Sequence, residues 1–202
     1  MPSGQYFEAE PGIASRPGRV TLALADLTAE LAVDRGVFSS ARIDPGTLVL
    51  LRALPPLADG TVLDLGCGYG PIACTLAHRS PGSTVWAVDV NQRAVALTVA
   101  NAASLGLPNV HAAGPDGLPD DIRFDAIVSN PPIRVGKDAL HGVLERWLPR
   151  LAPGGEAWLV VHRHLGADSL AAWLAAGGRG VERRASKQGY RLLRVTGGEK
   201  KP

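Results

Sequence analysis

The stretch VSNPPIRVGK, residues 128–137, follows an apolar run at 124–129 that is typical of a buried strand. Because proline cannot donate to a strand ladder, Pro131 and Pro132 would end this strand. Together with Asn130 they would also form a rigid group of carbonyl oxygens, since proline fixes its own φ angle. Such a group would accept hydrogen bonds from a ligand that offers N–H groups. The stretch alone leaves both interpretations open.

A second candidate for chemistry is DLGCGYG, residues 64–70, between an expected strand and an expected helix. Gly66, Gly68 and Gly70 would let the backbone approach a ligand closely, and the free N–H groups of the following helix favour a negative or polar group. Asp89 ends the next expected strand, at about the interval where acids bind ribose hydroxyls in nucleotide-binding α/β folds. This order predicts a site for a nucleoside-type cofactor.

The elements that must position these two stretches alternate between strands and helices from residue 61 onward. We predict strands at 61–65, 84–90, 109–114, 124–129 and 156–162, helices at 71–79, 92–106, 137–152 and 168–176, and a final hairpin of 180–186 with 190–196. Nearly continuous apolar strands joined by helices are typical of a parallel sheet covered on both faces. The pattern predicts an α/β fold: a Rossmann-like, doubly wound, mostly parallel seven-stranded sheet with an antiparallel C-terminal hairpin.

The residues before this sheet follow another pattern. Residues 19–26 and 28–34 alternate apolar with small or polar side chains, which predicts a small N-terminal β-hairpin covering one edge. Residues 47–54 favour a short helix. We expect one compact domain, in which residues 1–46 form a lead-in and hairpin packed on a core formed by residues 47–202.

Composition and charge narrow the classes of partner and location. Residues 179–202 hold eight of the 21 Lys and Arg but two of the 19 Asp and Glu. That bias favours an anionic partner, although a solvated strand pair with a frayed tail would show it too. No stretch reaches the roughly 18 uncharged apolar residues of a membrane span, and the start lacks the features of a signal peptide. The two cysteines make neither a disulfide framework nor a zinc site, which predicts a reducing, cytoplasmic location.

Three stretches together carry a resemblance to a known family. DLGCGYG, VDVN (88–91) and SNPPIRVGKDALH (129–141) are similar to class I S-adenosylmethionine-dependent methyltransferases. GVFS (36–39), DPGT (44–47) and KQGYRLLRV (187–195) extend the likeness to most of the chain. With them the chain resembles, more narrowly, the "methyltransferase small" family, which includes small-subunit rRNA guanine-N2 methyltransferases and their compact archaeal relatives. The glycine motif indicates only the superfamily. In this resemblance, Asn-Pro-Pro indicates methylation of an amino group.

The resemblance implies S-adenosylmethionine as the cofactor. Asp64 and the glycine loop would hold its methionine end, Asp89 would bind the ribose, and Asn91 would lie close to the adenosine. At the position where many relatives have an acid that contacts adenine, this chain has Gly114, and Asp116 lies two residues further on. The cofactor-binding residues that the resemblance implies are Asp64, Gly66, Cys67, Gly68, Gly70, Asp89, Asn91 and Asn130.

The Asn-Pro-Pro group suits methyl transfer to an amine, which is an in-line displacement whose rate depends on positioning. The Asn130 side-chain carbonyl and the Pro131 main-chain carbonyl would accept both N–H groups of the amine and favour the positive charge developing on nitrogen. Pro132 would stiffen the turn. Ile133 stands where the family commonly has Tyr or Phe, and it would press on a base without stacking as a π system. Phe38 is the candidate for the missing aromatic wall.

Basic residues would form a rim around this pocket. Arg134 and Lys137 follow the prolines, and Lys187 and Arg191 lie in the final hairpin, from which they would bind phosphates. The resemblance thus implies that residues 47–202 form a methyltransferase domain acting on an exocyclic amine of RNA, most closely guanine N2 of small-subunit rRNA. Two alternatives stay open: methylation of a protein glutamine or a small-molecule amine, and a non-catalytic RNA-binding protein with a methyltransferase fold.

Overall fold

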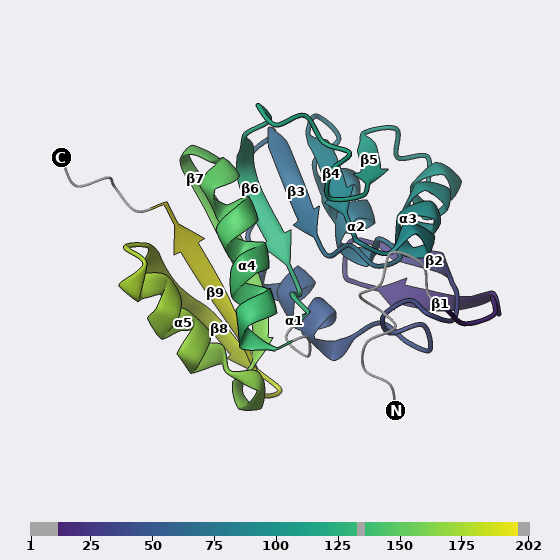
Figure 1. Ribbon diagram of the computed structural model, residues 1–202. Coiled ribbons are helices and arrows are strands. Elements are labelled where there is room, and N and C mark those ends of the chain that lie inside the picture. Colours follow the sequence, from purple (N-terminus) through teal and green to yellow (C-terminus); the bar gives the residue numbers. More distant parts are fainter. Residues whose placement is uncertain (1–11, 133–135, 198–202) are drawn as a thin grey trace.

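A computed structural model of the chain describes residues 12–132 and 136–197. Its centre is a seven-stranded sheet in the order β5-β4-β3-β6-β7-β9-β8 (Figure 1). β9 is antiparallel to both neighbours, and the other paired strands are parallel. The predicted fold class is therefore confirmed. The strands are β3 (Thr61–Leu65), β4 (Thr84–Val88), β5 (Val110–Ala113), β6 (Phe124–Ser129), β7 (Leu151–His162), β8 (Gly180–Lys187) and β9 (Tyr190–Thr196).

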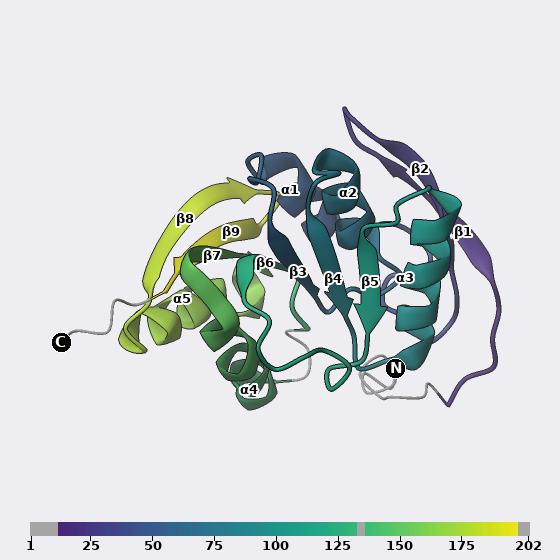
Figure 2. The same ribbon diagram turned by 90° about the horizontal axis from the view of Figure 1, so that it is seen from above.

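Helices cover both faces of this sheet, as Figure 2 shows. One face packs against α1 (Pro45–Ala53), α2 (Pro71–Arg79) and α3 (Gln92–Ser104), and the other against α4 (Lys137–Trp147) and α5 (Ala167–Ala176). Successive side chains of a strand point to opposite faces. Val128 accordingly belongs to the hydrophobic cluster of α1 and α2, and Ile127 belongs to that of α4 and α5.

The N-terminal hairpin, β1 (Gly18–Ala23) with β2 (Thr28–Val33), forms a separate two-stranded sheet. It lies against α3 rather than along an edge of the main sheet, which differs from the sequence-based expectation (Figure 2). Buried Asn101 of α3 explains the placement, because its side chain accepts from Ala32 N at 2.7 Å and donates to Ala32 O at 3.0 Å. The same amide donates to Tyr69 O in the glycine loop at 2.8 Å.

Two expected boundaries differ from the structure. The helix expected at 137–152 ends at Trp147, because Pro149 has no N–H to continue it, and a short 3-10 turn follows at Leu148–Arg150. β7 then begins at Leu151, five residues before the expected start, with a register shift opposite β6. Gly155 permits this path, since a Cβ there would lie 2.8 Å from Phe124 O. In the described part of the chain, no helix is long and apolar enough to cross a membrane.

Candidate active site

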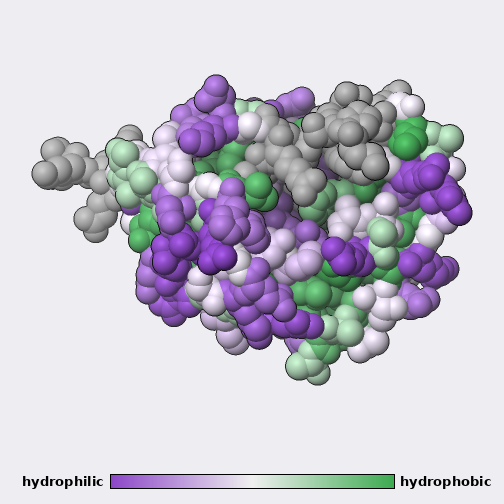
Figure 3. Space-filling view, turned by 90° about the horizontal axis from the view of Figure 1, so that it is seen from below, coloured by the Kyte–Doolittle hydropathy of each residue, from purple (hydrophilic) through white to green (hydrophobic). Residues whose placement is uncertain are grey.

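The carboxyl ends of the central parallel strands open into a cavity of about 710 Å³. β3 pairs with β6 at the point where the chain order reverses, so the loop after β3 and the residues after β6 are neighbours. Figure 3 looks onto this end of the sheet, where apolar surface lies between hydrophilic groups. The cavity thereby joins the two stretches singled out in the sequence. Among its lining residues are Phe38, Gly66, Gly68, Asp89, Asn91, Asn130, Pro131 and Pro132.

The glycine loop presents bare backbone to the cavity. Gly66 and Gly68 have φ angles of +78° and +58°, a backbone conformation that residues other than glycine rarely adopt. A Cβ at either position would meet nothing within 4 Å, so both border open space. Gly70 differs, because its Cβ would lie 2.9 Å from Thr98 Cγ2, and it does not line the cavity. Its place is the tight turn into α2, where it is the N-cap residue.

Asp89 lies one residue beyond β4 and faces the cavity. Its Oδ2 accepts from Gly68 N and its Oδ1 from Asn91 N, both at 2.9 Å. Burial raises the pKa of Asp89, while these backbone N–H groups oppose the rise. Each carboxylate oxygen keeps a second lone pair that could accept from a ligand hydroxyl. Asn91 also lines the cavity, caps α3 through Arg93 N at 3.0 Å, and donates to Gly36 O at 2.7 Å.

Asp64 and Cys67, both expected among the cofactor contacts, are buried and do not line the main cavity. Asp64 Oδ2 accepts from Ala73 N at 2.9 Å and thereby joins the end of β3 to the start of α2. Its Oδ1 is buried and accepts no hydrogen bond from the described residues. Burial raises the pKa of Asp64 to about 8, and it raises the pKa of the Cys67 thiol well above its usual value. The thiol of Cys67 packs near Thr98 Oγ1 at 3.5 Å.

We expect Asp64→Asn to stabilise the ligand-free protein increasingly as the pH rises from about 4 to about 8. The carboxyl ionises near 3.8 in the unfolded chain and near 8 in the folded one, so the folded state binds the extra proton and loses stability across that interval. Asparagine carries no such charge. The two thermal midpoints should converge near pH 4 and separate by several degrees at pH 8 in a scanning fluorimetry series. A pH-independent difference would contradict the buried-carboxyl assignment.

Asn130 is held in one orientation by residues at the start of α1. Its side-chain NH₂ donates to Asp44 Oδ1 at 2.8 Å and to Thr47 Oγ1 at 3.0 Å. Asp44 is also the N-cap of α1, accepting from Gly46 N at 2.8 Å and Thr47 N at 3.2 Å. Because a carboxylate only accepts, the Asn130 carbonyl oxygen must point away from it. That oxygen accepts no hydrogen bond within residues 12–132 and 136–197, and Asn130 lines the cavity.

Asp44 is thus a positioning residue that sequence reasoning missed, although an acid before proline at a helix start is a readable cap signal. We expect Asp44→Ala to lower kcat by about tenfold or more, because the Asn130 amide loses its anchor, with cofactor affinity little changed. The lost cap also costs about 1 kcal/mol of stability. Asp44→Asn is the matched control, since an amide oxygen still accepts from both the helix N–H groups and Asn130. Equal kcat values for the alanine and asparagine variants would contradict the anchoring role.

Of the residues expected in the basic rim, none that the structure describes lines the cavity. Lys137 and Lys187 are exposed, but neither lines the cavity. Arg191 is mostly buried in β9 and forms an ion pair with Asp168, so its charge is engaged within the fold. Phe38 does line the cavity and is 42% exposed. Its place supports an aromatic wall rather than a core position.

Two expected site residues, Ile133 and Arg134, lie outside the described residues. The final hairpin contributes Tyr190 to the cavity instead of a cation. Its ring packs edge-on against His162, with centroids 4.8 Å apart, and a Cβ at Gly46 would lie 2.6 Å from its Cε1. The DPGT and KQGY stretches are therefore in contact, and both contribute residues to the cavity.

Exposed apolar side chains lie at the cavity. Within the described ranges, the exposed large hydrophobic side chains are Phe38, Val90, Val99 and Leu165, and all but Val99 line the cavity. Large apolar groups left in solvent around a cavity favour the binding of a flat, partly apolar ligand such as a nucleobase.

One face of α4 closes the remaining side of the cavity. Its lining residues recur at helical spacing, a pattern that can be read in the sequence: Ala139, Gly142, Val143 and Arg146. Arg146 forms an ion pair of 2.7 Å with Asp116, the residue considered for adenine recognition. Asp116 itself is exposed and does not line the cavity, whereas Pro115 does.

Comparison with known proteins places the chain in a family. The family described as "Methyltransferase small domain" matches residues 28–194. The uncharacterized protein YbxB of Bacillus subtilis (strain 168) is 33% identical over 197 residues, which cover 96% of this chain and 98% of that protein. Ribosomal RNA small subunit methyltransferase C of Pseudomonas aeruginosa (strain LESB58) is 38% identical over 174 residues, which cover 78% of this chain and 52% of that protein.

The fold has a similar solved structure in T. thermophilus 16S rRNA N2 G1207 methyltransferase (RsmC), in complex with AdoMet and guanosine. The two align with a TM-score of 0.74 and 26% identity over 94% of this chain and 52% of that one. The chain thus spans about half the length of the two rRNA methyltransferases. Both the family match over most of the chain and the identity to YbxB along nearly its full length agree with the motifs: the chain belongs to the methyltransferase small domain family.

Proposed function

We propose that this protein transfers a methyl group from S-adenosylmethionine to an exocyclic amine of RNA, with guanine N2 of small-subunit rRNA as the favoured target. Membership of the methyltransferase small domain family supports methyl transfer. The AdoMet and guanosine in the RsmC complex support the cofactor and the class of target. The chain spans about half of that relative. The assignment of guanine as the target therefore depends on the cavity of this chain as well as on the likeness to RsmC.

The residues present fit the cofactor. The cavity of about 710 Å³ is large enough for a nucleoside-sized molecule, and Gly66 and Gly68 leave open space on its floor. Asp89 offers carboxylate lone pairs to ribose hydroxyls at the edge of the loop. Behind the loop, Asp64 Oδ1 accepts no hydrogen bond from the described residues, and the Asp64 carboxyl group would ionise more readily beside a cation. S-adenosylmethionine is a cation, and when bound it supplies an electrophilic methyl group on a sulfonium.

The observation that carries the proposal is the anchored Asn130 amide. With both of its N–H groups donated to Asp44 and Thr47, its carbonyl oxygen is preorganised to accept an N–H from the target amine. An exocyclic amine on a base is a weak nucleophile, because its lone pair is delocalised into the ring. Accepting its N–H orients that lone pair and stabilises positive charge on nitrogen as the new bond forms. The proton can leave afterwards, so no strong general base is required.

The exposed apolar side chains at the cavity support a base as the target. An exocyclic amine within a duplex is out of reach, so the nucleotide would be unpaired or extruded to enter the cavity. Phe38 and Leu165 at the mouth would contact such a base through dispersion.

Mapping of modified nucleotides in rRNA and tRNA, with and without the gene, tests the proposal in cells. We expect one N2-methylguanosine of small-subunit rRNA to disappear without the gene and to return with the wild-type gene. Loss of a protein methylation with unchanged rRNA would favour a protein amide as the substrate instead. In calorimetry, absence of heat with both S-adenosylmethionine and its demethylated product would end the cofactor assignment.

A further inference from the structure

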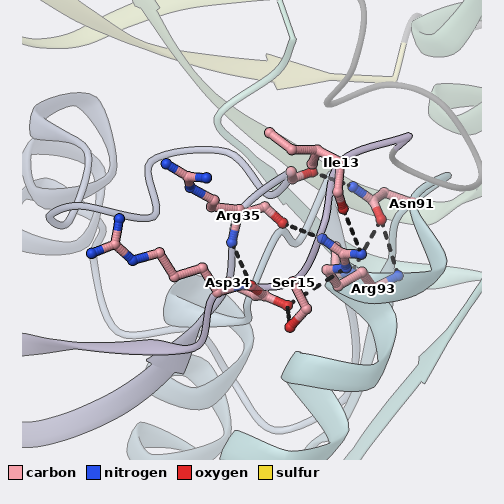
Figure 4. Close-up of polar contacts among 9 residues, drawn as sticks. Ile13, Ser15, Asp34, Arg35, Asn91 and Arg93 are labelled. Carbon is pink, nitrogen blue, oxygen red and sulfur yellow. Dashed lines mark hydrogen bonds and ion pairs between the residues drawn. The ribbon is translucent and has the colours of Figure 1, made fainter.

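A carboxylate latch centred on Asp34 joins Ser15 and Arg16 to Arg35 (Figure 4). Buried Asp34 accepts through Oδ2 from Ser15 Oγ at 2.7 Å, and through Oδ1 from Arg16 N at 2.5 Å and Arg35 N at 2.7 Å. Burial opposes its ionisation, but the hydrogen bonds from Ser15 and the two backbone N–H groups hold the pKa of Asp34 below its usual value. The latch is therefore charged at neutral pH.

The first turn of α3 completes the latch. Arg93 Nε lies 3.6 Å from Asp34 Oδ2, and its guanidinium donates to Arg35 O at 2.6 Å and to Ile13 O at 3.1 Å. The Asn91 side chain donates to Gly36 O at 2.7 Å and so holds the residue after Arg35. In Figure 4 these side chains converge, whereas the side chain of Arg35 extends away from Arg93.

The latch holds the backbone of two exposed arginines, Arg16 and Arg35, and Arg35 lies two residues before Val37 of the cavity lining. Arg16 N and Arg35 N share one carboxylate oxygen, so the two arginines leave the backbone from neighbouring points. Arg42 lies further along the same segment and lines the cavity, as do Val37 and Phe38. The side chains of Arg16, Arg35 and Arg42 are exposed, and within the described ranges none of them forms an ion pair or a side-chain hydrogen bond.

The net charge of the latch residues is positive. Arg93 balances the Asp34 carboxylate, which leaves Arg16 and Arg35 without a counter-charge in the latch. Arginine presents a planar fork of donors that matches the oxygens of a phosphate, and it stays charged at any physiological pH. Exposed arginines whose backbone is held close to a base-sized pocket are suited to a polyanion whose backbone passes the pocket mouth.

We propose that Arg16, Arg35 and Arg42 form a phosphate-binding strip for the RNA strand that flanks the target nucleotide. This inference rests on the proposed function and adds a specific contact surface to it. The strip lies on the α3 side of the cavity, whereas Lys137, expected in the rim, begins α4 on the other face of the sheet. It replaces the contribution expected from Arg191, whose charge Asp168 engages.

Binding of a fluorescein-labelled, mixed-sequence single-stranded RNA, followed by anisotropy over a series of salt concentrations, tests the strip. Each alanine variant of Arg16, Arg35 or Arg42 should reduce the slope of log K against log salt by about 0.7, and the triple variant by about 2. Arg35→Lys should keep the slope, because the charge remains. The latch uses backbone groups of Arg16 and Arg35, so removal of their side chains leaves it in place.

The matched control is Arg123→Ala, which removes an exposed arginine just before β6, at the end of the sheet opposite the cavity. It should keep the wild-type slope. A triple variant that is folded and retains the wild-type slope overturns the strip while leaving the proposed function intact. Wild-type protein that binds S-adenosylmethionine but no RNA refutes the RNA target itself. Equal, arginine-dependent binding of polyglutamate and RNA would indicate an acidic protein surface as the partner, and would also overturn the proposal.

Discussion

Asn130→Ala should lower kcat by about 10²- to 10³-fold and leave the affinity for S-adenosylmethionine within about threefold of wild type. The reason is the geometry of one amide. Its NH₂ is committed to Asp44 and Thr47, which fixes the carbonyl oxygen as an acceptor in the cavity. Removing that oxygen withdraws an interaction that grows stronger as charge develops on the amine. Such a loss reduces kcat and kcat/KM together.

Single-turnover methyl transfer and calorimetry separate the two quantities. Asn109→Ala is the matched control, because the NH₂ of Asn109 is also donated within the fold, to Ser83 O at 3.0 Å, but before β5 and away from the cavity. It should lose stability and keep kcat. An Asn130→Ala enzyme with near wild-type kcat would refute the acceptor role. A comparable loss of cofactor affinity would instead assign Asn130 to the cofactor.

Asp89→Ala should weaken binding of S-adenosylmethionine by about 10²-fold or more. Hydrogen bonds to a charged acceptor each contribute about 1.5–3 kcal/mol, and the proposed ribose contact uses the Asp89 carboxylate beside the glycine loop. The substitution also frees Gly68 N and Asn91 N, the two backbone groups that Asp89 holds at 2.9 Å. The loop therefore loses its preorganisation together with its ligand contact.

Asp125→Ala gives a matched comparison for this variant. Asp125 also accepts from a backbone N–H, that of Thr61 at 2.8 Å, but at the start of β3 rather than beyond the end of β4. Its loss should lower the thermal midpoint without changing the cofactor Kd measured by calorimetry. Equal Kd values for the Asp89 and Asp125 variants would exclude Asp89 from the cofactor site.

The sequence was sufficient for the parallel sheet, because mostly apolar strands such as residues 124–129 alternate with helical segments along the chain. It was also sufficient to bring Gly66, Gly68, Asp89 and Asn130 together, since all follow strands whose carboxyl ends meet at one edge. The hairpin was misplaced for a different reason. Its contact with α3 depends on Asn101, 69 residues away from Ala32, and no local pattern encodes such a pair.

The parts of the site that sequence reasoning missed depend on tertiary contacts. Asp44 was recognisable as a helix cap, but its bond to Asn130 joins residues 86 positions apart. The engagement of Arg191 by Asp168 has the same character, since a cation in a basic stretch looks free until its partner is placed. The family resemblance implied that Asp64 touches the cofactor, and the structure buries its side chain behind the loop. Spacing along the chain indicates proximity to a loop, and it does not decide on which side of that loop a side chain lies.

The central claim, that the anchored Asn130 amide positions a base amine for methyl transfer, has one direct measurement. Small-subunit rRNA and assembled small subunits from a strain without the gene are incubated with the protein and S-adenosylmethionine that carries a deuterated methyl group. The RNA is then digested to nucleosides for mass spectrometry. We expect the label in N2-methylguanosine with the wild-type protein and its near absence with Asn130→Ala. Label on a ring carbon or a ribose oxygen, or equal labelling by both proteins, would contradict the claim.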